Sequence, residues 1–222
     1  MTTRTVELHR TDPYDRRFDA RVTVVDGNRV ELDSTLFYAR SGGQPGDTGT
    51  LNGLPVLDVH YDEGKQRVFH LMDDADAAGL SPGVPVTGDI DWERRYRLMR
   101  HHTAQHLLWC AFVSAYGTGH RELGGDIGEA KARLDIGLAE GAPRPDADRV
   151  AAELTRLVTL DLPIRRYPGE AGEDQWVWEI DGYDPIPCGG THLRTTGEVG
   201  RAATRVKRKG SGVFRLEVSV VT

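Results

Sequence analysis

The sequence has little cysteine. Among 222 residues only Cys110 and Cys188 occur, too few for a disulfide framework. It has no apolar run near the roughly 20 residues that a membrane-spanning helix needs. The opening residues, Met1–Arg4, also lack the apolar core of a signal peptide. These absences argue against a disulfide-stabilised scaffold and a helical membrane protein. We therefore expect a soluble protein of the reducing cytoplasm, with no membrane among its partners.

An excess of positive charge is also absent, since 28 Lys and Arg stand against 34 Asp and Glu for a net charge of −6. Proteins that bind nucleic acid indiscriminately are usually basic, so this balance argues against that class. The basic residues are nevertheless clustered, with Arg94, Arg95, Arg97 and Arg100 in one group and Arg201, Arg205, Lys207, Arg208, Lys209 and Arg215 in another. Two interpretations stay open: solvated faces of ordinary elements, or a local surface that contacts phosphates.

The first 90 residues have the pattern of short strands joined by glycine turns. Asp26-Gly27-Asn28 separates two strand-like segments, Arg21–Val25 and Arg29–Leu32, and predicts a β-hairpin. Asn52-Gly53 predicts a second turn of the same kind. Evenly spaced strands with glycine turns favour a small β-barrel. We therefore expect residues 1–90 to form an N-terminal β-barrel-like domain.

From residue 91 the pattern becomes helical and then mixed. Apolar spacing predicts a helix that runs to about Tyr116 and ends at the following glycine. A second helix is expected from Ala147 to Asp161, with Asp146 as its N-cap. Other segments alternate like strands, and a closing hairpin is expected around Gly210-Ser211-Gly212. Helices on one face of an antiparallel sheet are the simplest arrangement, which gives a two-layer α/β domain over 91–222 and an α+β fold overall.

Two pairs of metal-binding residue types occur with the same spacing of four. His102 and His106 lie in a stretch with a helical pattern, where positions i and i+4 share one face, so both imidazoles can reach one point. Cys188 and His192 form the second pair, around two glycines. Three nitrogens and one thiolate are a soft, tetrahedral donor set of the kind that zinc prefers. The alternative is that the histidines have structural roles and that Cys188 is a small buried apolar residue.

These residues stand in motifs that resemble a known family. His102-Thr103-Ala104-Gln105-His106 and Cys188-Gly189-Gly190-Thr191-His192 are similar to the paired metal motifs of the editing domain of alanyl-tRNA synthetases. The same motifs mark the freestanding AlaX proteins, and a related domain edits in threonyl-tRNA synthetases. The run from Leu32 to Gly49 resembles the glycine-rich signature of this family, with Ser41 in the place of a frequent third glycine. The resemblance covers nearly the whole chain, and the length fits the medium-length AlaX type.

The resemblance implies an enzyme that hydrolyses the ester joining a wrong amino acid, typically serine, to alanine tRNA. It assigns 91–222 to a zinc-binding tRNA-editing domain of the second additional domain type, with Zn²⁺ held by His102, His106, Cys188 and His192. A zinc ion can act as a Lewis acid or lower the pKa of a bound water to about 7. Four protein ligands would instead close a tetrahedral site and make the ion structural. The sequence leaves open whether zinc activates water or only positions the substrate.

Thr35 and Gln44 are further site residues that the resemblance implies. Thr35 matches a threonine of the family motif, and its hydroxyl would pair with the hydroxyl of a seryl group, a partner that an alanyl group lacks. Gln44 lies in the glycine-rich loop and is expected to line the same pocket, while the loop glycines make turns. The alternative for Thr35 is an ordinary strand residue. Arg133 and Asp135 favour an exposed strand pair over a site role, and Cys110 is expected in the core.

The sequence supports three functions. The first is a zinc-dependent deacylase that acts in trans on mischarged alanine tRNA, chiefly the seryl form, or on another misacylated tRNA. The second is a non-catalytic tRNA-binding module with structural zinc. The third is a zinc hydrolase of small esters, against which the C-terminal basic run argues. No phosphate-cradling motif for ATP and no nucleophile with a dedicated base is evident. We expect a monomer, because no oligomerisation segment like that of the synthetases follows Thr222.

Overall fold

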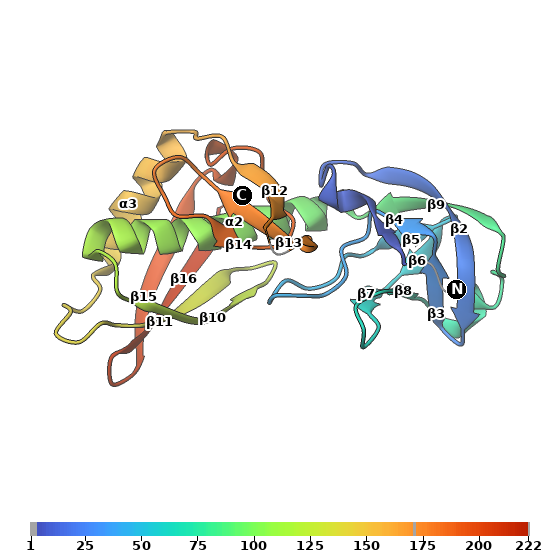
Figure 1. Ribbon diagram of the computed structural model, residues 1–222, viewed down its shortest axis with the longest axis horizontal. Helices are drawn as coiled ribbons and strands as arrows, with labels where there is room; N and C mark the ends of the chain where they lie inside the picture. The colour runs from blue at the N-terminus through green and yellow to red at the C-terminus, as the bar shows by residue number, and fades with distance from the viewer. Residues whose placement is uncertain (1–3, 171, 222) are drawn as a thin grey trace. The chain divides into compact units, whose positions relative to one another are not determined.

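The computed structural model describes residues 4–170 and 172–221, and the chain divides into two compact units (Figure 1). Unit 1 is Met1–Tyr96 and unit 2 is Arg97–Thr222. The division falls inside helix α2 (Trp92–Tyr116), and the domain boundary expected after residue 90 stays a prediction. Among the described residues, no helix is both long and apolar enough to cross a membrane.

Unit 1 is built on a seven-stranded antiparallel sheet with the order β6-β5-β9-β2-β3-β8-β7. The longest strand, β2, alternates exposed and buried side chains over its first part, because successive side chains of a strand point to opposite faces. The buried ones join an apolar core that includes Val22, Val30, Leu32 and Phe37. The strands of this sheet are β2 (Arg17–Asp26), β3 (Arg29–Leu32), β5 (Gly49–Leu51), β6 (Leu54–Val56), β7 (Asp58–Tyr61), β8 (Val68–Leu71) and β9 (Pro85–Ile90).

Four shorter elements complete the described part of unit 1. Strands β1 (Val6–Glu7) and β4 (Ser34–Thr35) pair with each other in parallel. The 3₁₀ turn η1 (Leu8–Arg10) follows β1, and the one-turn helix α1 (Asp74–Ala77) follows β8. The pairing of β1 with β4 places Thr35 on a strand, ahead of the glycine-rich loop.

The predicted hairpin between β2 and β3 is confirmed, with Gly27 at a φ of 59°. The Asn52-Gly53 turn joins β5 to β6 as predicted. The expected barrel is not confirmed: in the residues that the structure describes, the sheet is open, with β6 and β7 at its edges. These two strands follow each other along the chain with only Leu57 between them. A tight hairpin has about two loop residues, so the strands that would close the barrel cannot pair with each other.

Unit 2 contains a four-stranded antiparallel sheet, in the order β10-β11-β16-β15, and two helices (Figure 1). Both predicted helices are confirmed. Helix α2 ends at Gly117, whose N–H donates to the Val113 carbonyl at 2.8 Å. Helix α3 (Ala147–Thr159) begins at Asp146, whose side chain accepts the Arg149 N–H at 2.9 Å. The strands are β10 (Arg121–Ile127), β11 (Ala132–Gly137), β15 (Ala202–Gly210) and β16 (Val213–Val220), and the last two form the expected closing hairpin.

A three-stranded antiparallel sheet, in the order β12-β13-β14, also belongs to unit 2. Strand β12 (Arg165–Gly169) lies at its edge and follows Pro163, in accord with the missing backbone donor of proline. Strand β13 (Gly172–Glu179) is central, and β14 (Ile186–Pro187) ends directly before Cys188. The 3₁₀ turn η2 (Gly197–Val199) comes before β15. This small sheet therefore supports the start of the second metal motif.

Candidate metal centre

Helix α2 presents His102 and His106 on one face, one turn apart. Both side chains are buried, and their ring centroids lie 5.0 Å apart. Between them, Gln105 fastens the helix to β11, because its amide donates to the Arg133 carbonyl at 2.6 Å. Gly125 of β10 permits this approach, since a Cβ at that position would overlap the Gln105 amide. Gln105 thus sets the rotation of the helix about its axis, and with it the direction of both imidazoles.

The second pair of donors comes from the segment that follows β14. The Cys188 N–H donates to the Trp176 carbonyl at 2.7 Å, which anchors the start of the segment on β13. At its other end, the Thr103 hydroxyl accepts the Leu193 N–H at 3.1 Å and lies 3.3 Å from Nδ1 of His192. With Nδ1 protonated, the imidazole donates to Thr103, and its Nε2 has the free lone pair that a metal needs. Thr103 therefore links the two motifs.

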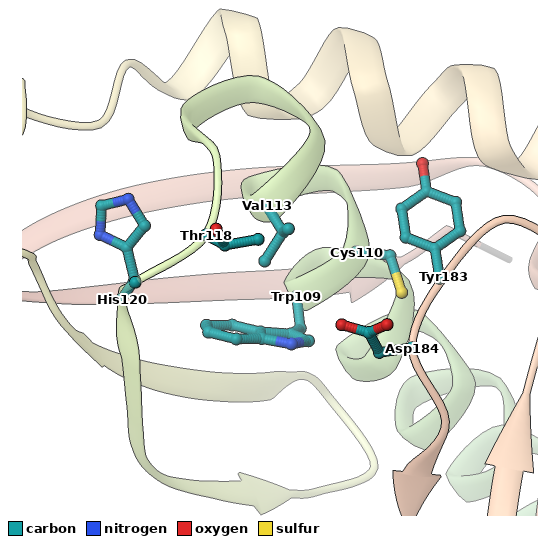
Figure 2. Close-up of a pocket in the computed structure, with 8 residues that line it drawn as sticks. Trp109, Cys110, Val113, Thr118, His120, Tyr183 and Asp184 are labelled. Carbon is teal, nitrogen blue, oxygen red and sulfur yellow. The ribbon is translucent and has the colours of Figure 1, made fainter.

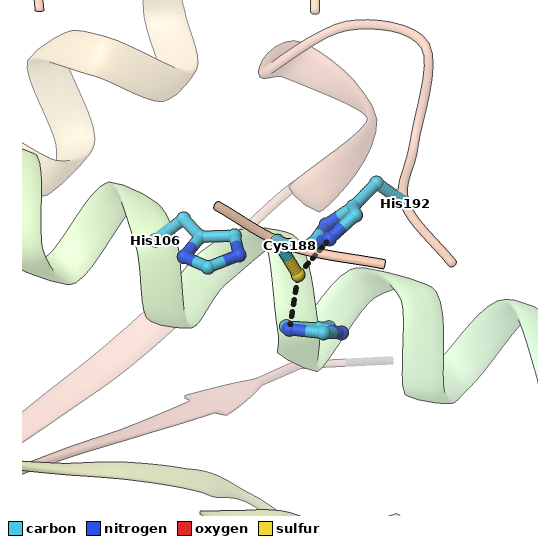
Figure 3. Close-up of side chains that lie close together, drawn as sticks. His106, Cys188 and His192 are labelled. Atoms are coloured by element: carbon cyan, nitrogen blue, oxygen red, sulfur yellow. Dashed lines mark hydrogen bonds between the residues drawn. The ribbon is translucent and has the colours of Figure 1, made fainter. Parts of the chain in front are cut away.

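The four predicted ligands meet in space. One donor atom from each of His102, His106, Cys188 and His192 lies within 4.8 Å of the others. The Cys188 sulfur lies 3.4 Å from Nε2 of His102 and 3.2 Å from Nε2 of His192 (Figure 3). The bond lengths of tetrahedral zinc place a sulfur and a nitrogen ligand about 3.5 Å apart. The spacing of the donors is therefore close to what such an ion requires.

A buried atom without a partner supports the same fit. Nε2 of His106 is buried and has no hydrogen-bond partner in the described part of the chain. A buried polar atom in this condition costs free energy, and coordination of a cation would remove the cost. Imidazole nitrogens with a sulfur are donors for zinc and similar ions, whereas Mg²⁺ and Ca²⁺ prefer oxygen. The residues present therefore fit a bound metal ion.

Burial sets the protonation of these donors. It lowers the pKa of His106 to about 3, and it is the main reason why the pKa values of His102 and His192 lie well below the usual range. The rings are therefore neutral near pH 7, which is the form that binds metals. Burial also raises the pKa of the Cys188 thiol to about 11. A bound cation favours the thiolate and opposes that shift.

Three residues around the centre gave no signal in the sequence. Trp178 is fully buried and lies against His106, with ring centroids 5.0 Å apart at an angle of 37°. After the dominant effect of burial, the positive charge of Arg166 lowers the pKa of the Cys188 thiol and the charge of Glu122 raises it. Burial raises the pKa of the Glu122 carboxyl. These residues come from β13, β12 and β10, so only the fold brings them near the motifs.

Thr35 and Gln44 both lie in unit 1. Thr35 is fully buried, its hydroxyl lies 2.8 Å from Nε2 of His70, and it accepts the Phe37 N–H at 3.1 Å. Gln44 is buried at the end of a tight turn, in which its N–H donates to the Ser41 carbonyl at 2.9 Å. The metal donors belong to unit 2, so the roles of Thr35 and Gln44 in substrate recognition stay predictions.

A buried ion pair fixes the glycine-rich loop. The Asp47 carboxylate accepts Nε–H of Arg95 at 2.9 Å, and both side chains are fully buried. The same guanidinium donates to the Leu36 carbonyl at 2.7 Å. A Cβ at Gly46 or Gly49 would overlap backbone carbonyls of β7 or β9, so these two glycines allow close packing rather than making a turn. The loop is thus a packed part of unit 1, whereas the pattern of glycines alone indicated only turns.

The remaining expectations concern residues outside the centre. Arg133 and Asp135 form the expected strand pair, with 3.2 Å between their charged groups, and both are partly exposed. Asp135 is also bonded to Arg215 at 2.7 Å, so its carboxylate has a structural role. Cys110 is buried in the core as expected, and both cysteines are free thiols. Neither cysteine belongs to a disulfide, which leaves Cys188 available as a metal ligand.

Comparison with known proteins agrees with these observations. No protein-family model matches the chain. The chain is 34% identical to the alanyl-tRNA editing protein AlaX-M of Pyrococcus horikoshii, over 98% of this chain and 99% of that protein. It is 36% and 35% identical to the alanine-tRNA ligases of Pyrobaculum arsenaticum and Ignicoccus hospitalis, over 96% of this chain but only 26% of each ligase. With its four metal-ligand residues assembled and its whole length aligned, the chain belongs to the family of the alanyl-tRNA editing protein AlaX-M.

Proposed function

We propose that the protein is a metal-dependent deacylase that removes a wrong amino acid, chiefly serine, from alanine tRNA. One observation carries the proposal: His102, His106, Cys188 and His192 meet in a chain that aligns over nearly its whole length with a protein named for alanyl-tRNA editing. The reaction is hydrolysis of a carboxylic ester. Water adds to the carbonyl carbon, the bond to the ribose oxygen breaks, and that oxygen takes up a proton. The products are the free amino acid and the uncharged tRNA.

We assign Zn²⁺ to the four donors, because the set of nitrogens and sulfur matches its preference. Bound there, zinc supplies Lewis-acid chemistry for the ester carbonyl or for a water molecule. The positive charge of Arg166 acts on the Cys188 thiol. A cation near the metal donors would stabilise the negative charge that develops on the ester carbonyl oxygen during hydrolysis. Glu122 also acts on that thiol, and we assign its carboxylate to accept a proton from water.

We propose that Thr35 selects the seryl group. Its hydroxyl hydrogen is directed at His70 and one lone pair accepts the Phe37 N–H, so one lone pair is left for a further donor. A seryl O–H supplies that donor, whereas an alanyl group has none, and a site built for a hydroxyl discriminates strongly against the analogue that lacks it. Gln44 is proposed to line the place where the aminoacyl group binds, through the rigid turn that holds it.

Deacylation assays with purified protein test the function. Seryl-, glycyl- and alanyl-tRNA(Ala) are the substrates, and we expect the seryl form to be hydrolysed fastest. The His102→Ala/His106→Ala double variant is expected to be inactive, while His60→Ala, which removes a histidine from β7, keeps the wild-type rate. A wild type no faster than the double variant overturns the proposal. Seryl-tRNA of threonine identity, assayed in parallel, separates an alanine-specific enzyme from an editor of another tRNA.

The closed set of four protein donors supports a second candidate, a non-catalytic tRNA-binding module with a structural metal ion. This candidate binds tRNA with an affinity that falls as salt rises, yet it does not hydrolyse any charged form. The assay above distinguishes the two, provided that tRNA binding is measured on the same preparation.

We further propose that the protein works as a monomer in the cytoplasm, where tRNAs are charged. All four donors come from one chain, so the centre needs no second copy. Sedimentation of the metal-loaded protein is expected to give the mass of one chain. A concentration-independent mass of two chains would contradict the monomer.

A further inference from the structure

The four predicted metal donors differ in how the surrounding chain holds them. Nδ1 of His192 lies 3.3 Å from the Thr103 hydroxyl, and its Nε2 lies 3.2 Å from the Cys188 sulfur. Nε2 of His102 lies 3.4 Å from the same sulfur. His106 is different, because its buried Nε2 has no hydrogen-bond partner among the described residues. No hydrogen bond at this nitrogen orients the ring, so packing has to do so.

Three rings pack against His106 in the described part of the chain. Those of His192 and His102 have centroids 4.9 and 5.0 Å away, and both belong to predicted donors. The third ring is the indole of Trp178, 5.0 Å away at an angle of 37°. The indole centroid also lies 6.2 Å from that of His192, in the second motif. Among the described residues, Trp178 is thus the one ring outside the donor set that lies against both motifs.

Trp178 is itself fixed by the sheet that carries it. It lies in the central strand β13, paired with Arg166 of β12 on one side and with Ile186 of β14 on the other. Its side chain is the largest of the fully buried ones in the described residues. Protein interiors have few voids, so a neighbour of this kind leaves few rotamers open to the ring beside it. The indole therefore forms a rigid wall for the His106 imidazole.

We propose that Trp178 is a positioning residue, which holds the His106 imidazole in the orientation that a metal ion needs. The inference rests on the metal centre of the proposed function. A donor that is already oriented loses little conformational entropy when it binds an ion, so pre-organisation increases affinity. Thr103 orients His192 through a hydrogen bond, whereas Trp178 orients His106 through ring packing.

The indole N–H has a competing role. Nε1 of Trp178 is buried and has no hydrogen-bond partner among the described residues. Such a donor would instead serve a molecule bound in the site, because buried polar groups are usually paired. Phenylalanine separates the two roles, since it keeps an aromatic ring at the same strand position and removes the N–H. Leucine removes both the ring and the N–H.

The zinc affinity of the metal-free protein tests the proposal, measured by competition with a chromophoric chelator. Trp178→Leu is expected to weaken zinc binding by about 10–100-fold, the usual effect of losing a residue that orients a ligand. Trp178→Phe is expected to stay within about threefold of the wild type, because its ring still packs on the imidazole. Urea unfolding of each metal-free variant is measured alongside. A loss of core packing alone lowers stability but leaves the zinc affinity of the folded protein unchanged.

Trp109→Leu is the matched control, because it makes the same change in the same unit. Trp109 lines a hollow of about 150 Å³ together with Cys110 and Val113, and no metal donor is among its lining residues (Figure 2). The Trp109 ring lies against that of Phe112, with centroids 6.1 Å apart. This variant is expected to lose some stability and to keep the zinc affinity of the wild type.

A double-mutant cycle shows whether Trp178 acts through His106. A chelator of lower affinity brings the weaker sites of the histidine variants into range. In the His106→Ala background, Trp178→Leu is expected to change the zinc affinity by less than about twofold. In the His102→Ala background it is expected to cost as much as in the wild type, because His106 is still present. An equal loss in both backgrounds would show that Trp178 does not act through His106.

The outcomes separate this inference from the function on which it rests. If the wild type and Trp178→Leu bind zinc equally tightly, the inference is overturned and the proposed function is untouched. If Trp178→Phe loses as much affinity as Trp178→Leu, the N–H is responsible, and positioning by the ring is overturned as well. If the variants behave as expected but the wild type hydrolyses no seryl-tRNA(Ala), the proposed function fails and the inference stands.

Discussion

The hydroxyl of Thr35 lies 2.8 Å from Nε2 of His70, and the other ring nitrogen of His70 lies 2.9 Å from the Val30 carbonyl oxygen. A carbonyl only accepts, so the proton of the neutral ring is on Nδ1. Nε2 is then an acceptor, and the Thr35 hydroxyl must donate to it. His70 is fully buried, and burial lowers its pKa to about 4, so the ring is neutral near pH 7. His70 thereby orients the hydroxyl that we propose as the serine selector.

Replacement of Thr35 by valine is expected to have two effects. It leaves Nε2 of His70 and the Phe37 N–H without their partner, which should lower the free energy of unfolding by about 1–3 kcal/mol. It also removes the proposed serine contact, so the preference for seryl- over alanyl-tRNA(Ala) should fall by about tenfold or more. Urea unfolding and deacylation rates measure the two effects separately.

Thr35→Ser is the matched control, because it keeps the hydroxyl in the same chain position. It should retain most of the stability and of the preference for the seryl substrate. If Thr35→Val loses stability but discriminates as well as the wild type, Thr35 is a structural strand residue, and the serine selector lies elsewhere.

His70 should also make stability depend on pH. The pKa of a histidine in the unfolded chain is about 6.5, whereas that of folded His70 is about 4. Between these values the unfolded chain binds more protons, so stability falls as the pH is lowered through this window, by an amount of the order of 3 kcal/mol. The His70→Gln variant lacks this pH-dependent contribution to stability, because glutamine does not titrate. Urea unfolding at pH 7.5 and 4.5 should therefore show a smaller loss for the variant. Equal losses would rule out a buried neutral His70 as a source.

Metal removal should destabilise the protein. A ligand that binds only the folded state at about 100 times its Kd contributes about 2.7 kcal/mol, so chelation should lower the Tm by several degrees.

Cys188→Ser and His106→Ala should lose stoichiometric metal, because each removes one of four donors. Cys110→Ala is the matched control, since that thiol lies outside the donor set. Elemental analysis gives the metal content. A wild type with no metal and a Tm indifferent to chelator would contradict the centre.

The outer face of β15 should contact tRNA phosphates. Thr204 faces α3, with its hydroxyl 3.5 Å from the Ala147 carbonyl, so the next residue, Arg205, points away from the helix. Lys209 is exposed at the irregular end of the strand. Arg205→Ala/Lys209→Ala should weaken tRNA binding and reduce the slope of log K against log salt by about 0.9 for each lost contact with duplex phosphate. Arg144→Ala, an exposed arginine outside the sheet, should leave the slope unchanged. An unaltered slope in the double variant would show that tRNA binds elsewhere.

The sequence predicts elements whose pattern is local and periodic. Helix α2, the Asp146 cap of α3 and the hairpin at Gly27 all depend on residues within a few positions of one another. Strand β10 was not predicted, because Gly124 and Gly125 interrupt the alternation of its side chains. Its strand conformation depends on its hydrogen-bonded pairing with β11. The expected barrel is not confirmed, for a related reason. Closure depends on which distant strands pair, and the one-residue link at Leu57 becomes significant only once the strand order is known.

The residues of the candidate site also fall into those that the sequence predicts and those that it does not. Its four donors follow from two motifs with a spacing of four, so they could be named before the fold was known. Trp178, Arg166 and Glu122 could not, because each stands in a strand whose composition is ordinary and whose neighbours come from distant segments. The Asp47–Arg95 pair is another example: an arginine in a basic cluster turns out to be fully buried against the glycine-rich loop.

The two halves of the metal centre are far apart in sequence, since His102 and Cys188 are separated by 86 positions. An ion bound by both halves would therefore act as a removable cross-link. By the chain-entropy model for disulfides, closing a loop of this length restricts the unfolded chain by about 4–5 kcal/mol at most. Helix α3 and the three-stranded sheet lie inside that loop, so a bound ion would add to the hydrogen bonds by which Thr103 already joins the two motifs. The complete set of four donors cannot assemble until His192 has been synthesised, so an ion would bind all four only after most of unit 2 has been made.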